Sequence, residues 1–438
     1  MEHRAARRRL IDDGAPPSVV AAFERRLAQL DDPDAGLLPS TAIEPVHGDV
    51  PQLDALPSAA AAQVAGRLAV IKLNGGLGTS MGLRGPKSLI EVKPGVTFLD
   101  VIARQAGDLP LVLMSSFATR DATRQAAADR ALRLRGFLQS REPKLRADTL
   151  EPVDWPANPE LEWCPPGHGD LYVSLAASGM LDELLADGID WAFVSNSDNL
   201  GATVDPRIPA WAEARRIPFV MEVVRGTAAD RKGGHLAVRH GRMILRETAQ
   251  APPGDASFTD VARWRYYNTN NLWMDLRRLE ALLDADPAGP ALPLIVNRKT
   301  VDPADPSSPA VLQLETAMGA AIGAIDGARA VLVPRTRFAP VKTTDDLLLV
   351  RSDAYTLDDD GRLSPTFAGD PPVVALDPEV YRLLPEADRR FPAGPPSLRA
   401  ARRLTVHGDV TFGAGVSVIG DVTVQGPATI PDGAVLTG

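Results

Sequence analysis

The chain has 438 residues, 45% of them hydrophobic and 24% charged, with a formal net charge of −9 and a single cysteine. This length allows a large core but exceeds one average domain, and the acidic balance argues against general nucleic-acid binding. One cysteine, Cys164, excludes an intrachain disulfide and favours a reducing, cytoplasmic location, while no uncharged apolar run is long enough for a membrane span and no signal core is present.

Residues 1–60 are predicted to form a helical appendage followed by a linker. Residues 19–27 have the apolar spacing of an amphipathic helix, and Ser18 is placed to cap it. Prolines at positions 33, 39, 45 and 51 mark the linker. The basic run from Arg4 to Arg9 is interpreted as a solvated helix face, with contact to acidic lipid or nucleic acid as the alternative.

A buried strand and a glycine-rich loop come next. Residues 68–73 are apolar and β-branched, which predicts the strand, and glycines follow at positions 75, 76, 78, 82 and 85. Glycine lets backbone N–H groups approach an anion, and Lys87 adds a cation that can reach back over the loop. The dinucleotide fingerprint lacks its third glycine at Met81, and the P-loop is broken by Pro86. The pattern therefore predicts another kind of phosphate site, against the alternative of a turn without a ligand.

Residues 72–88 resemble the signature loop of the UTP–glucose-1-phosphate uridylyltransferases, the eukaryotic-type UDP-glucose pyrophosphorylases. Their string Leu-Asn-Gly-Gly-Leu-Gly-Thr-Ser-Met-Gly is narrower than the loose pattern of the wider nucleotidyltransferase superfamily. The resemblance is dense over residues 60–355 and implies a catalytic domain at residues 61–355. It also implies a UTP-binding set and one catalytic lysine in this loop: Leu73, Gly75, Gly76 and Lys87.

Strands and helices alternate in the following segment. Strands are predicted at residues 88–92 and 109–115, and helices at residues 97–104 and 119–135. This alternation predicts an α/β fold with a doubly wound, mostly parallel sheet, whose ligands gather beyond the carboxyl ends of the strands. The resemblance implies that it is a nucleotidyltransferase sheet. The resemblance implies that Met114 binds UTP and that Gln139 faces the uracil, where an ordinary surface glutamine is the alternative.

Residues 164–170 read Cys-Pro-Pro-Gly-His-Gly-Asp. A lone histidine is usually structural, but two prolines and two glycines hold this one in a rigid turn. The resemblance places Gly167 near the base and His168, as a catalytic residue, near the phosphates. The family usually has an aromatic residue where Cys164 stands, and we expect that change to affect only packing.

The strand predicted at residues 189–194 runs into Ser-Asn-Ser-Asp-Asn. A carboxylate at the end of a central strand is a natural metal ligand when a triphosphate lies nearby, and an aspartate that caps a turn is the alternative. The resemblance continues through Asp205. It implies that Asn196 and Asp198 bind UTP and that Asp198 also binds Mg²⁺.

Four residues beyond the strand predicted at residues 219–224 are implied by the resemblance to bind the sugar phosphate: Gly234, Glu247, Asn268 and Asn270. Asparagine amides and glutamate carboxylates can pair with sugar hydroxyls, although Asn-rich loops are ordinarily turns. The family usually has Phe where Tyr267 stands, which is a mild departure.

A second lysine follows a strand near the end of the catalytic region. Residues 313–319 are interpreted as the start of a buried helix and residues 330–334 as a strand. Lys342 then stands in Pro-Val-Lys-Thr-Thr. A single lysine is nearly always solvent-facing, but this setting matches the family lysine that reaches the phosphates. Lys342 is therefore predicted to be catalytic.

The tail has a period of six residues. Apolar side chains recur at positions 406, 412, 418, 424, 430 and 436, and a second series follows the same period. A sustained hexapeptide period predicts a parallel β-helix, here left-handed, over residues 404–436 of a C-terminal domain at residues 356–438. Its open end favours a homo-oligomer contact, whereas alternation within one antiparallel sheet is the competing explanation.

Motifs and resemblance together predict reversible transfer of a uridylyl group from UTP to glucose 1-phosphate, with Mg²⁺ as cofactor. The attacking phosphate is already anionic, so positioning and charge stabilisation carry the reaction and no general base is required. Three alternatives stay open. One is a pyrophosphorylase for another sugar 1-phosphate, such as N-acetylglucosamine 1-phosphate; another is a non-catalytic nucleotide-sugar binding protein. The third is a Rossmann oxidoreductase, which the missing third glycine disfavours.

Overall fold

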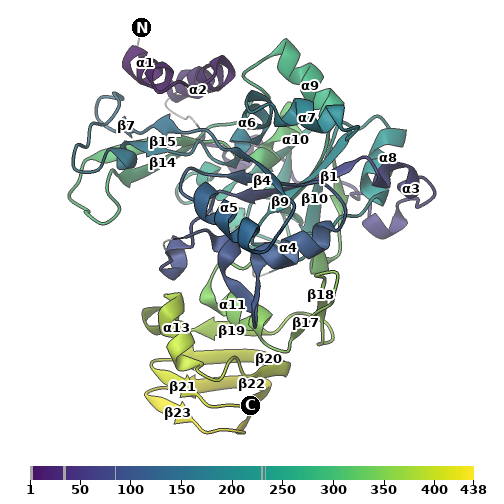
Figure 1. Cartoon of the computed structure of the whole chain (residues 1–438), viewed down its shortest axis with the longest axis vertical. Coiled ribbons are helices and arrows are strands. Elements are labelled where there is room, and N and C mark those ends of the chain that lie inside the picture. The colour runs from purple at the N-terminus through teal and green to yellow at the C-terminus, as the bar shows by residue number, and fades with distance from the viewer. Residues whose placement is uncertain (1–2, 33–35, 84, 228–229, 232) are drawn as a thin grey trace.

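The computed structural model describes residues 3–32, 36–83, 85–227, 230–231 and 233–438. Two N-terminal helices lie at one end of the long axis, a large sheet lies in the middle, and stacked C-terminal strands lie at the other end (Figure 1). Nine strands form the central sheet: β1 (Leu68–Asn74), β4 (Leu111–Ser115), β5 (Arg135–Leu138), β9 (Trp191–Asn196), β10 (Phe219–Arg225), β11 (His235–Arg239), β12 (Arg242–Arg246), β13 (Tyr266–Asp275) and β16 (Arg329–Leu332).

The central sheet is parallel in one half and largely antiparallel in the other. Strands β9, β1, β4 and β5 pair in parallel in that order. Strand β13 joins β9 in antiparallel orientation and connects to the β11–β12 hairpin and to β10, which pairs in parallel with β16. The predicted α/β class is therefore confirmed, and parallel strands carry the glycine loop at its centre.

Two N-terminal helices cover a small separate sheet. α1 (Arg4–Asp12) and α2 (Pro17–Leu30) bury apolar side chains, Phe23 among them, against β7 (Leu145–Arg146), β14 (Ile295–Thr300) and β15 (Ala310–Glu315). The helix predicted from residue 19 is confirmed, but its cap is wrong. Pro16 holds the N-cap position, and Ser18 lies within the first turn because Pro17 favours a helix start.

The basic run is not simply a solvated face. Arg9 lies in α1 and donates to the carbonyl of Val153 at 2.8 Å. Its guanidinium also pairs with the buried carboxylate of Glu162, and it stacks 5.6 Å from the centre of the Trp163 ring. At least this arginine therefore fixes α1 to the rest of the protein.

The C-terminal segment folds into one antiparallel hairpin, β17 (Tyr355–Leu357) with β18 (Leu363–Pro365), and into parallel sheets and short helices. Its other elements are α11 (Thr344–Arg351), β19 (Val373–Leu376), α12 (Pro378–Tyr381), α13 (Leu384–Arg390), β20 (Ser397–His407), β21 (Val410–Phe412), β22 (Ser417–Gln425), β23 (Ala428–Ile430) and β24 (Val435–Thr437). Strands β19, β20, β22 and β24 pair in parallel in that order, and β21 pairs in parallel with β23. These pairings exclude one antiparallel sheet as the reason for the hexapeptide period.

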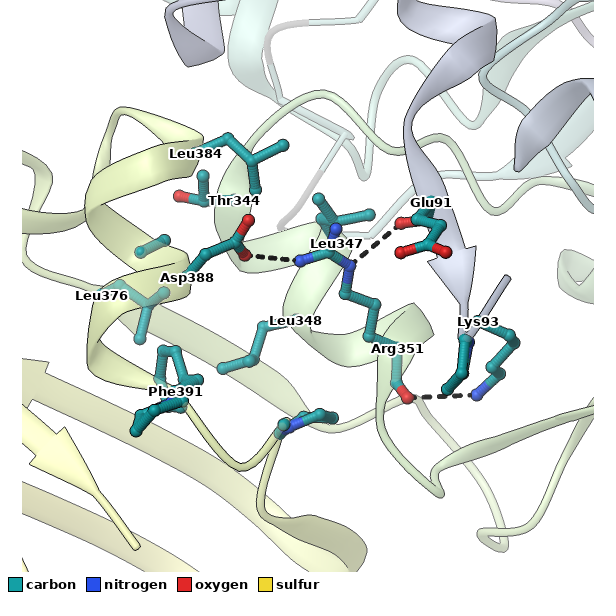
Figure 2. Close-up of a pocket in the computed structure, with 15 residues that line it drawn as sticks. Glu91, Lys93, Thr344, Leu347, Leu348, Arg351, Leu376, Leu384, Asp388 and Phe391 are labelled. Carbon is teal, nitrogen blue, oxygen red and sulfur yellow. Dashed lines mark hydrogen bonds and ion pairs between the residues drawn. The ribbon is translucent and has the colours of Figure 1, made fainter. Parts of the chain in front are cut away.

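A pocket of about 410 Å³ lies where the C-terminal segment meets the central region (Figure 2). Arg351, at the end of α11, pairs with Asp388 at 2.7 Å and donates to the carbonyl of Glu91 at 3.0 Å. Lys93 donates to the carbonyls of Ser352 and Tyr355 at 2.7 and 2.8 Å. A cation that binds the free carbonyls beyond a helix C-terminus is favourable, so Lys93 fixes α11 to the central region.

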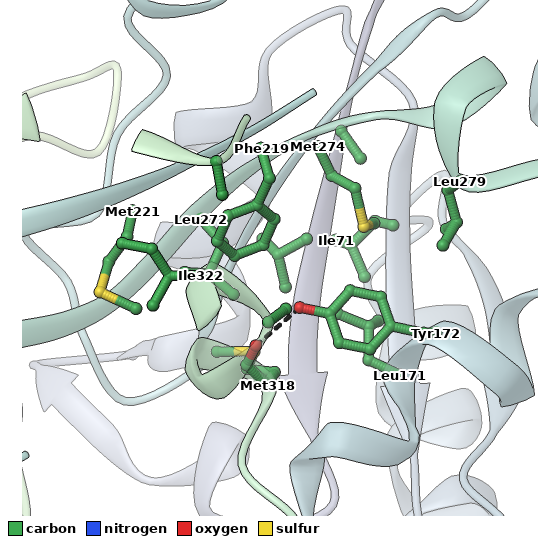
Figure 3. Packing of buried hydrophobic residues seen from close by; sticks show 14 of the residues in the cluster. Ile71, Leu171, Tyr172, Phe219, Met221, Leu272, Met274, Leu279, Met318 and Ile322 are labelled. Carbon is green, nitrogen blue, oxygen red and sulfur yellow. Dashed lines mark hydrogen bonds between the residues drawn. The ribbon is translucent and has the colours of Figure 1, made fainter. Parts of the chain in front are cut away.

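Helices cover both faces of the central sheet. One face packs on α6 (Leu171–Ala177), α7 (Met180–Ala186), α9 (Leu276–Ala285) and α10 (Ala321–Ala324), and the other on α3 (Ala61–Ala65), α4 (Phe98–Ala106), α5 (Arg120–Asp129) and α8 (Arg207–Ala214). Alternate side chains of β1 enter each layer, because Ile71 joins the first core and Val70 the second. In the first core, the hydroxyl of Tyr172 donates to the carbonyl of Met318 at 2.7 Å (Figure 3).

Three predicted elements differ from the structure. The helix predicted at residues 119–135 ends at Asp129, because Ala131 takes a positive φ of 52° and the chain then enters β5. Residues 313–315 complete β15, and the buried helical turn begins only at Met318. The strand predicted at residues 88–92 begins only at Glu91.

The remaining short strands are β2 (Glu91–Lys93), β3 (Val96–Thr97), β6 (Glu142–Pro143) and β8 (Trp163–Cys164).

Candidate active site

The predicted UTP-binding residues meet at the carboxyl ends of the parallel strands. Leu73 of β1 lies in register with Met114 of β4 and with Asn196 of β9. Met114 is 2% exposed and packs in the core, whereas Asn196 lines the cavity described below. Parallel strands end at a common edge, so the three loops that follow them are neighbours.

The glycine loop closes on itself ahead of Lys87. The amide of Lys87 donates to the carbonyl of Gly76 at 3.2 Å, and the amide of Gly78 donates to the carbonyl of Gly85 at 3.3 Å. A Cβ on Gly78 would lie 2.7 Å from Cδ1 of Leu83, so a larger residue there would require the Leu83 side chain to move. The closed loop places Lys87 at the start of a short 3₁₀ turn, Lys87–Leu89.

Lys87 pairs with Asp198, the carboxylate that follows β9. The ammonium nitrogen lies 2.8 Å from Oδ2 of Asp198, and both side chains are mostly buried. The other oxygen, Oδ1, is buried and has no hydrogen-bond partner among the described residues. A buried carboxylate oxygen without a partner suits a cation, because such groups are otherwise paired.

Gln139 joins the glycine loop to the histidine motif. Its side-chain Nε2 donates to the carbonyl of Gly167 at 2.7 Å, and its backbone N–H donates to the carbonyl of Ser115 at 2.8 Å. Its Oε1 lies beside Gly75, where an added Cβ would be 3.0 Å away. Gln139 is buried rather than on the surface. The predicted base-reading residues are therefore in contact with one another.

The turn around His168 is held by a facing segment. Gly167 has a φ of 77°, and a Cβ there would lie 2.6 Å from the carbonyl oxygen of Thr316. The amide of Gly169 donates to that carbonyl at 2.8 Å. Nδ1 of His168 accepts the backbone N–H of Met318 at 2.9 Å, and burial lowers the pKa of His168 to about 4. The ring is thus neutral near pH 7, with its proton on Nε2.

The predicted sugar-binding residues surround a cavity of about 720 Å³. Gly234, Glu247, Asn268, Asn270 and Lys342 all line it, together with Asn196. A Cβ on Gly234 would lie 2.6 Å from a carboxylate oxygen of Glu247. The side-chain amide of Asn268 donates to Oδ1 of Asn270 at 2.7 Å. Burial raises the pKa of Glu247, and nearby Lys342 opposes that shift.

Four polar residues beneath these loops were not predicted: Lys72, Asn199, Glu222 and Arg337. Lys72 is a lysine within an apolar strand, a signal that the sequence does contain. Its ammonium donates to Oγ of Ser195 at 2.8 Å and to the carbonyl of Ala202 at 3.2 Å. Burial, with Arg337 nearby, lowers the pKa of Lys72 to about 7. Glu222 and Arg337 have no comparable signal, because their contact joins residues far apart in the chain.

A glycine-rich loop with a lysine–carboxylate pair suits the phosphates of a nucleotide, and a cavity rich in amides and carboxylates beside it suits a phosphorylated sugar. These features define a sugar nucleotidyltransferase. A family model described as UTP–glucose-1-phosphate uridylyltransferase matches residues 22–418, and the chain belongs to that family.

Named relatives agree with this assignment. The enzyme of that name from Solanum tuberosum is 42% identical over 390 residues, which cover 84% of this chain and 80% of the relative. The Saccharomyces cerevisiae enzyme is 42% identical over 389 residues, covering 84% and 77%. A mutant UDP-glucose pyrophosphorylase from Leishmania major, solved in complex with UDP-glucose, superposes with a TM-score of 0.92 at 41% identity, covering 99% of this chain and 98% of that chain.

Proposed function

We propose that the chain transfers a uridylyl group from UTP to glucose 1-phosphate, giving UDP-glucose and pyrophosphate in a reversible reaction. One observation carries the proposal: Asp198 pairs with Lys87 of the glycine loop, while its neighbours Asn196 and Asn199 line the cavity of the sugar side. In this proposal the UTP region and the sugar region meet at one carboxylate, Asp198.

The reaction is a displacement at the α-phosphorus of UTP. A phosphate oxygen of glucose 1-phosphate forms the new P–O bond, and the bond from the α-phosphorus to the bridging oxygen of pyrophosphate breaks. The nucleophile carries its charge already, so the protein must align two polyanions and stabilise the charge that moves to pyrophosphate. We assign Lys87 and the amides of the glycine loop to the UTP phosphates, and Lys342 to the reacting phosphates.

His168 acts as a neutral hydrogen-bond donor in this proposal. Nδ1 already accepts the amide of Met318, so Nε2–H is the group left to donate to a phosphate oxygen. The lowered pKa of about 4 keeps the ring neutral across neutral pH. Gln139 and the backbone at Gly167 read the uracil, because an amide offers both a donor and an acceptor to the base edge.

Mg²⁺ is the cofactor we propose, with Asp198 as its protein ligand. The unpaired, buried Oδ1 of Asp198 fits this role. Among the described residues no group of three or more His, Cys, Asp or Glu side chains could hold a metal, which suits an ion that takes one carboxylate plus phosphate oxygens and water. When bound, Mg²⁺ supplies positive charge to the phosphate oxygens.

The glucose moiety is assigned to the cavity lined by Gly234, Glu247, Asn268 and Asn270. Turnover of UTP and glucose 1-phosphate, followed by pyrophosphate release, tests the function directly. We expect turnover with UTP and Mg²⁺ and much less with N-acetylglucosamine 1-phosphate. Preference for another sugar 1-phosphate would show that the chain is a pyrophosphorylase for that sugar. Binding of UDP-glucose without turnover would show that it is a non-catalytic binding protein.

The tail is proposed to be a left-handed parallel β-helix that makes a homo-oligomer contact. Leu404 pairs with Val422, and Val418 pairs with Leu436, so the partners in each pair are three hexapeptide repeats apart. Val435 on the last strand is 62% exposed, and Ile419 is 43% exposed. Val435→Asp should lower the oligomer number in light scattering without a change in kcat. An unchanged oligomer number would show that this end is inert.

A further inference from the structure

A buried ion pair lies beneath the loops that carry Asp198 and Lys342. Glu222 of β10 is fully buried, and Arg337, in the 3₁₀ turn Arg335–Arg337, is 7% exposed. Arg337 Nη2 lies 2.6 Å from Glu222 Oε1, and Nε lies 2.9 Å from Oε2. This is a bidentate pair with two parallel hydrogen bonds.

The carboxylate is fully occupied by further donors. The indole of Trp273 donates to Oε1 of Glu222 at 2.8 Å, and the amide of Asn271 donates to Oε2 at 3.0 Å. A buried ion pair is weak evidence for stability, since apolar residues of similar volume often serve as well. The donors from Trp273 and Asn271 fix the pair in the sheet, so the pair can hold the segments that contact it in place.

Arg337 extends its contacts to the loop that follows Asp198. Nη2 donates to the carbonyl of Thr203 at 2.7 Å, and Nη1 donates to the Thr203 hydroxyl at 3.3 Å. The backbone carbonyl of Arg337 accepts the side-chain amide of Asn199 at 3.1 Å. A Cβ on Gly201 would lie 2.4 Å from the carbonyl oxygen of Thr336, so the two segments are in direct contact.

The same two segments stay paired as far as Lys342. Oδ1 of Asn199 accepts the backbone N–H of Ala339 at 2.9 Å. The backbone N–H of Val341 donates to the carbonyl of Asp198 itself at 3.0 Å. Lys342 follows directly in the chain. The separation between Asp198 and Lys342 is thus set by a strip of hydrogen bonds that starts at Arg337.

We propose that the Glu222–Arg337 pair positions Asp198 and Lys342 relative to each other for the transfer step. The inference rests on the roles proposed above for those two residues. Displacement of a reacting group by about 1 Å can lower a rate about 10²-fold. The contacts of Gln139 with Gly167 and those within the glycine loop do not pass through this pair, so the share of UTP binding that these contacts supply should be spared.

The test is Glu222→Gln, which keeps the volume and removes the charge, together with Arg337→Met and the double variant. Each single variant should lower kcat by about tenfold to a hundredfold, while the dissociation constant of UTP changes less than about threefold. The double variant should be no worse than the worse single variant, because the pair acts as a unit.

Two further variants separate a positioning effect from a general effect on stability. Asp190→Asn removes the charge of a carboxylate that pairs with Arg67 and Arg277 at the opposite ends of the strands, and should leave kcat unchanged. Asn199→Ser keeps the ion pair but shortens the side chain that reaches Ala339, so it tests the strip if Glu222→Gln does not fold. It should lower kcat by about tenfold.

The inference is overturned if folded Glu222→Gln, or Asn199→Ser in its place, keeps the wild-type kcat. It is also overturned if UTP binding weakens as much as kcat. Asp198→Ala, measured alongside, separates this failure from that of the proposed function. If Asp198→Ala is inactive while Glu222→Gln is fully active, only the positioning role fails. An active Asp198→Ala would remove the premise for both.

Discussion

The two halves of the central sheet present different kinds of groups to the candidate site. At the ends of β1, β4 and β9 the parallel half presents mainly backbone and glycine, with one lysine–carboxylate pair, Lys87 and Asp198. The antiparallel half, β11 to β13, presents side chains such as Glu247 and Asn268 to a cavity. Backbone N–H groups can bind a phosphate in almost any sequence that includes glycine, because every residue except proline has an N–H. A sugar requires particular side chains to bind its hydroxyls. The nucleotide side is therefore easier to recognise from sequence than the sugar side.

The largest effect should come from the lysine of the parallel half. Lys87→Ala should lower kcat by a factor on the order of a hundred or more, because a preorganised charge contact to the phosphates is lost. Pyrophosphate release at saturating substrates measures it. Lys299→Ala, which removes a lysine that donates to Gln313 on the small sheet, should behave as wild type. Near-normal turnover in folded Lys87→Ala would show that the glycine loop binds phosphate without it.

Base recognition comes next in size. Gln139→Ala should raise the KM for UTP by roughly tenfold and weaken discrimination against CTP and TTP, because the lost hydrogen bond to a buried polar partner is worth about 1–2 kcal/mol. The three nucleotides are compared at fixed glucose 1-phosphate. If the preference for UTP is untouched, Gln139 only holds Gly167 in place and does not read the base.

A change confined to the sugar half should divide the two substrates. Gly234→Ala places a Cβ against the carboxylate of Glu247, so the KM for glucose 1-phosphate should rise by roughly tenfold while binding of UTP stays as in wild type. Gly66→Ala is the matched control, because nothing lies within 4 Å of its added Cβ. Equal loss of both substrates would contradict a separate sugar side.

The smallest effect concerns pH. The pKa of His168 in the folded chain is about 4, below its ordinary value of 6.5. Between these values the unfolded chain binds a proton that the folded chain does not, so this ring contributes stability above pH 6.5 that is lost as the pH falls towards 4. The melting temperature of wild type should therefore fall more steeply over that window than that of His168→Asn. If the melting temperatures of the two proteins fall equally with pH, the lowered pKa of His168 is contradicted.

The parts of the fold that were predicted correctly depend on local signals. The helix predicted at residues 97–104 is an example, because α4 begins just after Thr97, whose side chain accepts the amide of Asp100 and caps it. The helix predicted to residue 135 failed because its end depends on Ala131, whose left-handed conformation has no signature of the glycine or asparagine type. The Glu222–Arg337 pair was missed because two residues more than a hundred positions apart give no shared pattern.

The candidate site divides in the same way. The family resemblance named the residues that line the cavity and the loop, and the structure places Lys87 with Asp198 and Gln139 with Gly167. It also shows that Met114 is a core side chain, so its assignment to UTP stays a prediction. The hydroxyl of Tyr267, where the family usually has Phe, is buried without a hydrogen-bond partner among the described residues, and nothing in the structure explains it.

The limits of family similarity do not coincide with the limits of folded units. The match begins at residue 22, within α2, and ends at residue 418, within β22. A recombinant chain trimmed to those limits would lose all of α1 and the first turn of α2. Both contribute apolar side chains to the cluster that contains Phe23 and packs on the small sheet. It would also lose most of β22 and both later strands. Purification tags and fusion partners should therefore be joined before Arg4 and after Thr437, where they interrupt no helix or strand.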